Sequence, residues 1–200
     1  MRAIVIEKFG GPDSLVYKDL PEPEPLTGQV VIEVKAFGIN HAEMHMRRGE
    51  WAEAAKVSGT ECVGLVKAAP GGEFPFGAKV AARMGGLGRT INGSYAEYTR
   101  APVSNVALIE SDLPWAELAA IPETYATSWT CLYLTFFGSF AFGRPGFPLS
   151  DVPLQTIAEQ VAAGRLKARP SRVFRFEEIR EAHRVMEAGE AGGKMVVVHG

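Results

Sequence analysis

Short runs of β-branched residues, each followed by a glycine or proline turn, fill the first hundred residues and limit the fold most strongly. Residues 2–6 and 29–36 are two such runs, and others lie at 61–69, 78–84 and 94–102. Runs of this kind are typical of strands. In the second run, one face of the strand would carry Val30, Ile32, Val34 and Ala36. Short strands at this spacing predict a compact barrel or sandwich.

The other segments predict connectors and helices. Prolines at alternate positions in 19–28 (DLPEPEPLTG) remove ladder donors, so we expect a connector or an edge strand there. From Asp112 the sequence favours one or two helices, with Asp112 as N-cap and Pro114 at the first helical position. Helices near 152–164 and at 176–187, and strands at 172–176 and 194–199, follow. The predicted class is mainly β with flanking helices (α+β).

Composition is that of an ordinary soluble globular chain: 200 residues, 46% hydrophobic and 22% charged. A net charge of -2 argues against nucleic acid and anionic membranes as partners. The N-terminal apolar run is too short for a signal peptide or a membrane span, so we expect a cytoplasmic protein. Cys62 and Cys131 are far apart in apolar surroundings, and we expect both to be buried, reduced thiols.

The segment 134–147 (LTFFGSFAFGRPGF) holds five phenylalanines and a single charged residue. It is either a strand and loop of the core or a sheet edge that seeks a partner, in which case the chain forms a homo-oligomer.

The stretch FGINHAEMHMRRGEW places His41 and His45 four residues apart, after Asn40. On a helix the two histidines would share a face, but Glu43 does not directly follow the first, as the metalloprotease pattern requires. The other histidines, in a helix with a surface-like pattern (His183) and at the last strand (His199), do not complete a metal site. A histidine that handles a proton and a half-buried polar side chain both remain open for His45.

Glycine clusters do not form a dinucleotide-binding motif. Residues 85–88 (GGLG) precede a strand-like segment, which predicts a loop. Residues 188–193 (AGEAGG) lie after a helix and before a strand, which predicts a helix C-cap and a turn. The chain contains no unit of strand, glycine-rich turn and helix of the Rossmann type.

The order of segments resembles the medium-chain dehydrogenase/reductase superfamily, in its zinc-free, quinone oxidoreductase-like branch. The resemblance covers nearly the whole chain and rests on segments such as QVVIEVKAFGIN, GTECVG, FPFGAKVAA, GSYAEYTRAP, LAAIPETYATSW and PLQTIAEQVAAGRLKARPSRVFRF. It implies a GroES-like β-barrel catalytic domain in two parts, residues 1–133 and 134–200. The family's Rossmann cofactor domain, expected near 133–136, is missing from the chain.

The resemblance also implies site residues. Asn40 and His45 would be catalytic residues in the reactive cleft, and Thr60 and Glu61 would form its floor. Thr127 would face the nicotinamide of NADPH. Met84 and Tyr125 are further substrate-pocket candidates that are also compatible with the core. Taken by themselves, the residues also allow structural roles: Glu61 as an anchor of the barrel through an ion pair or backbone hydrogen bonds, and Thr127 as the cap of a helix turn.

In zinc-dependent relatives, a cysteine and a histidine bind the catalytic metal where this chain has Asn40 and Thr60. Both metal ligands are therefore replaced, and we expect no zinc. We also expect no tight binding of NADPH, because the cofactor domain is missing.

Two functions are compatible with these observations. The first is the substrate-binding domain of an NADPH-dependent quinone or enone oxidoreductase, inactive alone, with a small carbonyl or quinone compound as substrate. The second is a non-enzymatic binding or oligomerisation module on the same barrel, with 134–147 as its contact surface.

Overall fold

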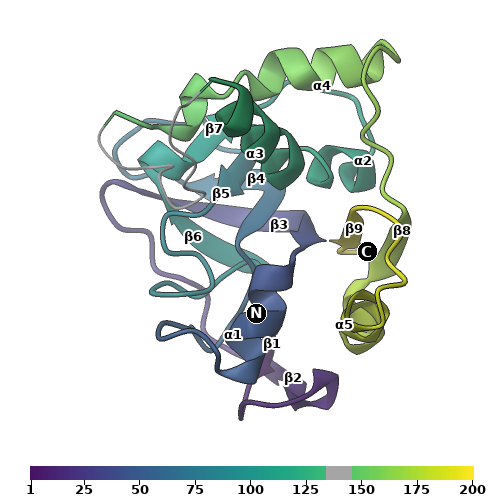
Figure 1. Ribbon diagram of the computed structural model, residues 1–200. Coiled ribbons are helices and arrows are strands. Elements are labelled where there is room, and N and C mark those ends of the chain that lie inside the picture. The colour runs from purple at the N-terminus through teal and green to yellow at the C-terminus, as the bar shows by residue number, and fades with distance from the viewer. Residues whose placement is uncertain (134–145) are drawn as a thin grey trace.

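A seven-stranded sheet dominates the computed structural model, which describes residues 1–133 and 146–200 (Figure 1). Hydrogen-bonded neighbours run in the order β7-β5-β4-β3-β9-β8, and β6 also pairs with β3. The strands are β3 (Gln29–Ile39), β4 (Glu61–Ala68), β5 (Lys79–Arg83), β6 (Tyr98–Pro102), β7 (Val106–Leu108), β8 (Arg172–Arg175) and β9 (Met195–Val198). The predicted mainly β class with flanking helices is confirmed.

Over the described residues, the hydrogen-bonded strands form an open sheet and not a closed barrel. The predicted closure of the barrel is therefore not observed. A separate antiparallel pair, β1 (Arg2–Ile6) and β2 (Leu15–Asp19), covers one side instead. Isolated bridges from Ala3 to Ala96 and from Val5 to Val57 attach it to the rest. Residues 20–28 contain no strand, as expected for a proline-rich connector.

Five α-helices lie around the sheet within the described ranges. They are α1 (His41–Arg48), α2 (Trp115–Ala119), α3 (Pro122–Tyr133), α4 (Leu154–Ala162) and α5 (Ile179–Glu187). Short 3-10 turns occur at Pro12–Ser14, Val103–Asn105, Leu149–Asp151 and Phe176–Glu178. Figure 1 shows α3 and α4 together at one end of the molecule, whereas α5 lies at the other, beside β8.

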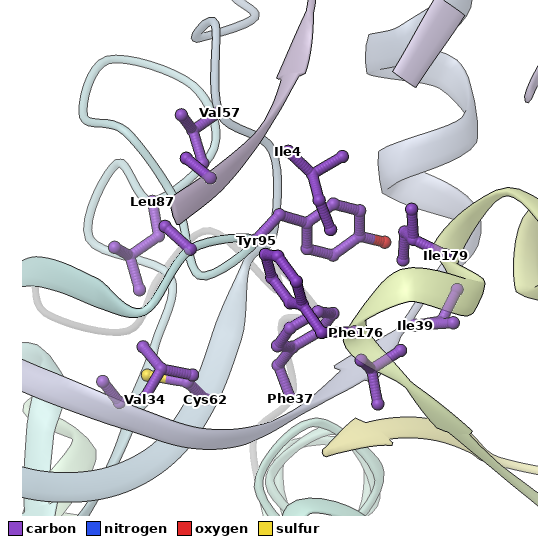
Figure 2. Packing of buried hydrophobic residues seen from close by; sticks show 14 of the residues in the cluster. Ile4, Val34, Phe37, Ile39, Val57, Cys62, Leu87, Tyr95, Phe176 and Ile179 are labelled. Carbon is purple, nitrogen blue, oxygen red and sulfur yellow. The ribbon is translucent and has the colours of Figure 1, made fainter. Parts of the chain in front are cut away.

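Each face of the sheet has its own hydrophobic core. One core lies between the sheet, β1 and α5, and Figure 2 shows its centre, where Phe37 and Tyr95 stack with ring centroids 4.7 Å apart. The other core lies under α2, α3 and α4 and includes Val63, Leu118 and Val196. Because both faces are covered, the central strands are apolar on both sides.

A β-bulge in β3 decides which side chains face the functional site. The pairing of β3 with β4 shifts between Val34 and Ala36. As a result Val34 belongs to the first core and Ala36 to the second, so the predicted single face of four residues is wrong at Ala36. An inserted residue reverses the alternation of side chains beyond it. Phe37 and Ile39 therefore enter the first core.

The C-terminal segment returns to the sheet formed by the N-terminal strands. Strand β9 lies antiparallel to β3, with Ile39 opposite Met195 and Gly38 opposite Val196. Strand β8 joins β9 in parallel and is the only parallel partner among the strands of the described ranges. Two segments that are 156 to 162 residues apart in sequence thus meet at the end of β3.

The expectations for Cys131 and Asp112 are wrong. Cys62 is buried as expected, but Cys131 is exposed, because no described residue covers its face of α3. Asp112 is not an N-cap: Pro114 takes that position, and its carbonyl accepts the first helical bond, from the Leu118 N–H at 3.0 Å. The helix therefore begins at Trp115.

His183 is fully buried and not on a surface. Its Nε2 lies 3.0 Å from the Tyr95 hydroxyl, and Arg47 Nε donates to its Nδ1 at 3.4 Å. Burial, helped by the Arg47 charge, lowers the pKa of His183 to about 3. The neutral imidazole thus connects α5 to α1 and to the segment that carries Tyr95.

Most of the predicted contact segment 134–147 lies outside the described residues, which resume at Gly146. Within the two described ranges, no helix has the length and apolar character needed to cross a membrane.

Candidate functional site

Glu61, at the first position of β4, is the centre of a buried polar cluster. Its side chain is inaccessible to solvent. One carboxylate oxygen accepts from Asn40 Nδ2 at 3.1 Å and from the Lys194 ammonium. The other accepts the Glu123 N–H at the start of α3, at 2.8 Å. A buried carboxylate requires such partners, and the helix N-terminus adds a favourable dipole.

Lys194 reaches the cluster because of the strand register. It precedes β9, and continuation of the β3–β9 pairing places it opposite Asn40. Its Nζ donates to Asn40 Oδ1 at 2.6 Å as well as to Glu61, and its side chain is only 11% exposed. A side chain at Gly38 would block this approach, since a Cβ there would lie 2.5 Å from Lys194 Cε and 2.2 Å from Glu61 Oε1. The absence of a side chain at Gly38 therefore leaves the space in which Lys194 reaches Glu61.

Glu43 supports the cluster from α1. It lies at the third helical position, where its carboxylate accepts the Asn40 N–H at 2.7 Å. It also accepts the Thr60 N–H at 3.0 Å and the Thr60 hydroxyl at 2.8 Å. Burial raises the pKa of Glu43 to about 7, although the Thr60 hydrogen bond and the Lys194 charge oppose the change. The carboxyl group is therefore able to hold a proton near neutral pH.

A second buried pair adjoins the first. Arg83 lies opposite Glu61 in the β4–β5 ladder, and its Nε donates to Glu123 of α3. Arg83 also donates to the Thr127 hydroxyl at 3.1 Å, and that hydroxyl donates to Glu123 at 3.0 Å. Burial alone would raise the pKa of Glu123, but the hydrogen bond and charge of Arg83 outweigh it and lower this pKa. These contacts fix α3 and orient Thr127.

The structure brings most of the predicted site residues together. Asn40, Thr60 and Glu61 are in direct contact, and Thr127 joins them through Glu123. Met84 is buried beside the cluster, and its N–H donates to the Thr60 carbonyl at 2.8 Å.

Tyr125 lies next to the cluster without belonging to it. With Lys194 it lines a hollow of about 400 Å³ between α3 and residues 167–169.

His45 is not brought to this cluster. Its Nδ1 pairs with Glu50, and its ring is stacked on Trp51 with centroids 6.2 Å apart. It lies one turn along α1 from His41, with its side chain 39% exposed. The geometry therefore gives no support to a place for His45 in the cleft.

Sequence reasoning missed four residues of the site: Glu43, Arg83, Glu123 and Lys194. One signal was present, because an acidic residue that begins an apolar strand, as Glu61 does, needs a cation when it is buried. The identity of that cation depends on the register of β3 and β9, which the local pattern does not contain.

Zinc does not suit this cluster. The two positions that would carry metal ligands hold an amide, Asn40, and a hydroxyl, Thr60. The ammonium of Lys194 already donates to the Asn40 and Glu61 oxygens. Over residues 1–133 and 146–200, no group of three or more His, Cys, Asp or Glu side chains is placed to hold a metal ion.

Family models match two parts of the chain that overlap slightly. Residues 27–111 match the alcohol dehydrogenase GroES-like domain, and residues 108–197 match a zinc-binding dehydrogenase family. Together with the fold and the site, these matches define the class: the chain belongs to the medium-chain dehydrogenase/reductase superfamily.

Individual relatives similar to the chain include quinone oxidoreductases and VAT-1 homologues. It is 33% identical over 136 residues to the synaptic vesicle membrane protein VAT-1 homolog-like of Mus musculus, covering 66% of this chain and 32% of that protein. It is 31% identical over 140 residues to the quinone oxidoreductase of Lama guanicoe, covering 66% and 40% respectively. The chain therefore spans less than half the length of these relatives.

Solved structures share the fold at low sequence identity. A mycobacterial quinone oxidoreductase aligns with a TM-score of 0.81 at 16% identity, covering 99% of both chains. A mycobacterial protein complexed with NADPH aligns with a TM-score of 0.77 at 15% identity, also covering 99% of both.

Proposed function

We propose that this chain is the substrate-binding domain of an NADPH-dependent oxidoreductase of quinones, enones or related carbonyl compounds. In this proposal, residues 1–133 and 134–200 are two parts of one GroES-like domain. The Rossmann domain that would bind the cofactor is missing near 133–136. The observation that carries the proposal is the buried cluster of Asn40, Glu61 and Lys194 beside the α3 N-terminus.

The cluster is suited to polarise a carbonyl group. Lys194 has three N–H donors, and Asn40 and Glu61 accept two of them, while its side chain also lines the adjoining hollow. The third donor has no partner among the described residues. In this proposal it binds the carbonyl oxygen of a substrate, where an ammonium held in a largely buried site acts strongly. Asn40 and Glu61 hold the ammonium in place, and Glu43 fixes the backbone of Asn40 and Thr60.

In an intact enzyme of this kind, NADPH supplies the hydride. Thr127, oriented by Arg83 and Glu123, would face the nicotinamide. The chain itself has no glycine-rich phosphate-binding unit. We therefore expect that it neither binds the cofactor tightly nor catalyses the reaction alone.

Titration calorimetry of the purified chain with NADPH, and then with NADH, tests this expectation. The expected result is no heat of binding up to about millimolar ligand, where binding is worth about 4 kcal/mol. A quinone-dependent oxidation of NADPH at about 1 per second or faster would show that the chain is a complete enzyme and would contradict the proposal.

A second candidate function is a binding or oligomerisation module without enzymatic activity. It is favoured by exposed apolar side chains on both sides of residues 134–145: Leu132 is 79% exposed and Phe147 is 40% exposed. Loss of a covering domain would leave such a surface open to a partner. A chain that stays monomeric at tens of micromolar in light scattering would argue against this function.

A further inference from the structure

The hollow next to Lys194 is the part of the site where a substrate has room. It has a volume of about 400 Å³, within the range of about 300–1,000 Å³ that is typical of small-molecule sites. It is lined by Ala120, Thr124, Tyr125, Ser128, Lys167, Ala168, Arg169 and Lys194.

The three hydroxyl groups of this lining already donate their protons to the main chain. Thr124 donates to the Ala120 carbonyl, Ser128 to the Thr124 carbonyl at 2.9 Å, and Tyr125 to the Lys167 carbonyl at 2.9 Å. Each hydroxyl carries a single proton. Side-chain hydrogen-bond donors for a ligand must therefore come from the charged residues of the lining.

All the charged side chains of the lining are cationic: Lys167, Arg169 and Lys194. Only Lys194 has an acidic partner, Glu61. For Lys167 and Arg169 no ion pair occurs with any residue of the two described ranges. The neighbouring hollow of about 510 Å³ shares Lys167 and Arg169 but includes the acidic Glu117. Of these two neighbouring hollows, only the one beside Lys194 has no acidic side chain among its described lining residues.

The three cations differ in their burial and in the groups that they are suited to bind. Lys194 is fixed and largely buried, whereas Lys167 and Arg169 are exposed and lie on a separate segment that also lines the hollow. A fixed ammonium suits a carbonyl oxygen, and a guanidinium with a neighbouring ammonium suits a carboxylate.

We infer that the substrate is a carbonyl compound that carries a carboxylate, with the carbonyl oxygen at Lys194 and the carboxylate at Lys167 and Arg169. This inference rests on the proposed function and names its substrate class as anionic instead of neutral. The carboxylate supplies part of the binding energy and sets which end of the molecule lies at Lys194.

The test compares levulinate, a keto acid, with its methyl ester, which has the same carbonyl group and no charge. Both are titrated into the purified chain by ligand-observed NMR in the absence of cofactor. We expect levulinate to bind about tenfold more tightly than the ester, as one charge-assisted contact of about 1.4 kcal/mol gives. Raising the ionic strength from about 0.02 M to 0.5 M should weaken the acid and leave the ester unchanged.

The variants separate this hollow from the rest of the surface. Lys167→Gln combined with Arg169→Gln should bring the affinity for levulinate down to that of the ester. The matched control is Lys56→Gln combined with Arg100→Gln, which removes one lysine and one arginine from a separate hollow of about 420 Å³. The control should leave the affinity for levulinate within about twofold of the wild type.

Several results would overturn the inference: equal affinities for the acid and the ester, no binding of levulinate at about 20 mM, or an equal loss in the control variant. Binding of inorganic phosphate as tight as that of levulinate would also overturn it, because the hollow would then suit the phosphate of a cofactor. The proposed function is judged separately, by NADPH binding and oxidation, so failure of one test is distinguishable from failure of the other.

Discussion

At the scale of single residues, Gly38 shows how one missing side chain makes room for a charged pair. The tip of Lys194 and the Glu61 carboxylate occupy the space that a Cβ at position 38 would need. Gly38 does not have a positive φ, so its role is steric and not conformational.

We expect Gly38→Ala to lower the free energy of unfolding by about 1–3 kcal/mol, because the added methyl group overpacks a buried site. Urea denaturation measures this change. Gly11→Ala is the matched control, since a Cβ there has open space and the φ of Gly11 is −72°. The control should change stability by less than about 1 kcal/mol, and an equally small change for Gly38→Ala would contradict the crowding argument.

Glu43 gives the cluster a dependence on pH. Its pKa in the folded chain is raised to about 7 from an ordinary value of 4.5. Between these two values the folded state holds a proton that the unfolded state has lost. The contribution of Glu43 to stability is therefore present in full below pH 4.5 and is lost as pH rises through 7.

The comparison with Glu43→Gln, which cannot titrate, isolates this contribution. As pH rises from 4.5 to 7.5, the unfolding free energy of the wild type should fall by about 3 kcal/mol relative to the variant. Urea denaturation at several pH values gives the difference. Glu22→Gln, on the exposed connector, should run parallel to the wild type. The same parallel course for Glu43→Gln would show that the pKa of Glu43 is not raised by folding.

At the scale of elements, the sequence predicted the strands and turns that depend on local patterns of residues. The runs at 2–6, 61–69, 78–84 and 172–176 all contain strands, because β-branched residues and glycine turns act within a few residues. The loop at 85–88 and the turn after α5 also agree with expectation, with Gly85 and Gly189 at positive φ. What sequence missed depends on pairing between strands: the bulge in β3, and the approach of Lys194 to Asn40.

Helix α5 carries a buried histidine, His183. Its titration changes the free energy of unfolding in the opposite direction to that of Glu43. The pKa of His183 is lowered to about 3, against 6.5 for an ordinary histidine. Between these values the unfolded chain binds a proton that the folded chain does not. The stability due to His183 is complete above pH 6.5 and is lost as pH falls through 3.

We expect the wild type to lose about 4 kcal/mol relative to His183→Gln as pH falls from 6.5 to 3. Acid-induced unfolding followed by circular dichroism measures the loss, and His41→Gln, on the exposed side of α1, is the control. Between pH 4.5 and 6.5 the contribution of Glu43 opposes that of His183, so the comparison with His183→Gln, and not the wild type alone, isolates the histidine. A wild type and His183→Gln with the same acid midpoint would rule out a neutral His183 in the fold.

At the scale of the whole molecule, the chain completes one sheet from two distant segments, and α3 ends with an exposed apolar side chain. Leu132 is 79% exposed at the end of α3, immediately before the segment 134–147 that we predict to mediate self-association. In the proposed function, the missing Rossmann domain would lie at this point. Without that domain, the apolar end of α3 is a candidate contact between two copies of the chain.

Light scattering across about 1–50 µM tests this contact, within the concentration range in which weak interfaces assemble. We expect the wild type to be dimeric or larger at the upper end, and Leu132→Glu to be monomeric, because a charge in an apolar contact is costly to bury. Phe76→Glu is the matched control: Phe76 is also 79% exposed, but it lies in the turn between β4 and β5. If both variants assemble like the wild type, the contact lies elsewhere; if Phe76→Glu alone dissociates, the turn and not the end of α3 joins the copies.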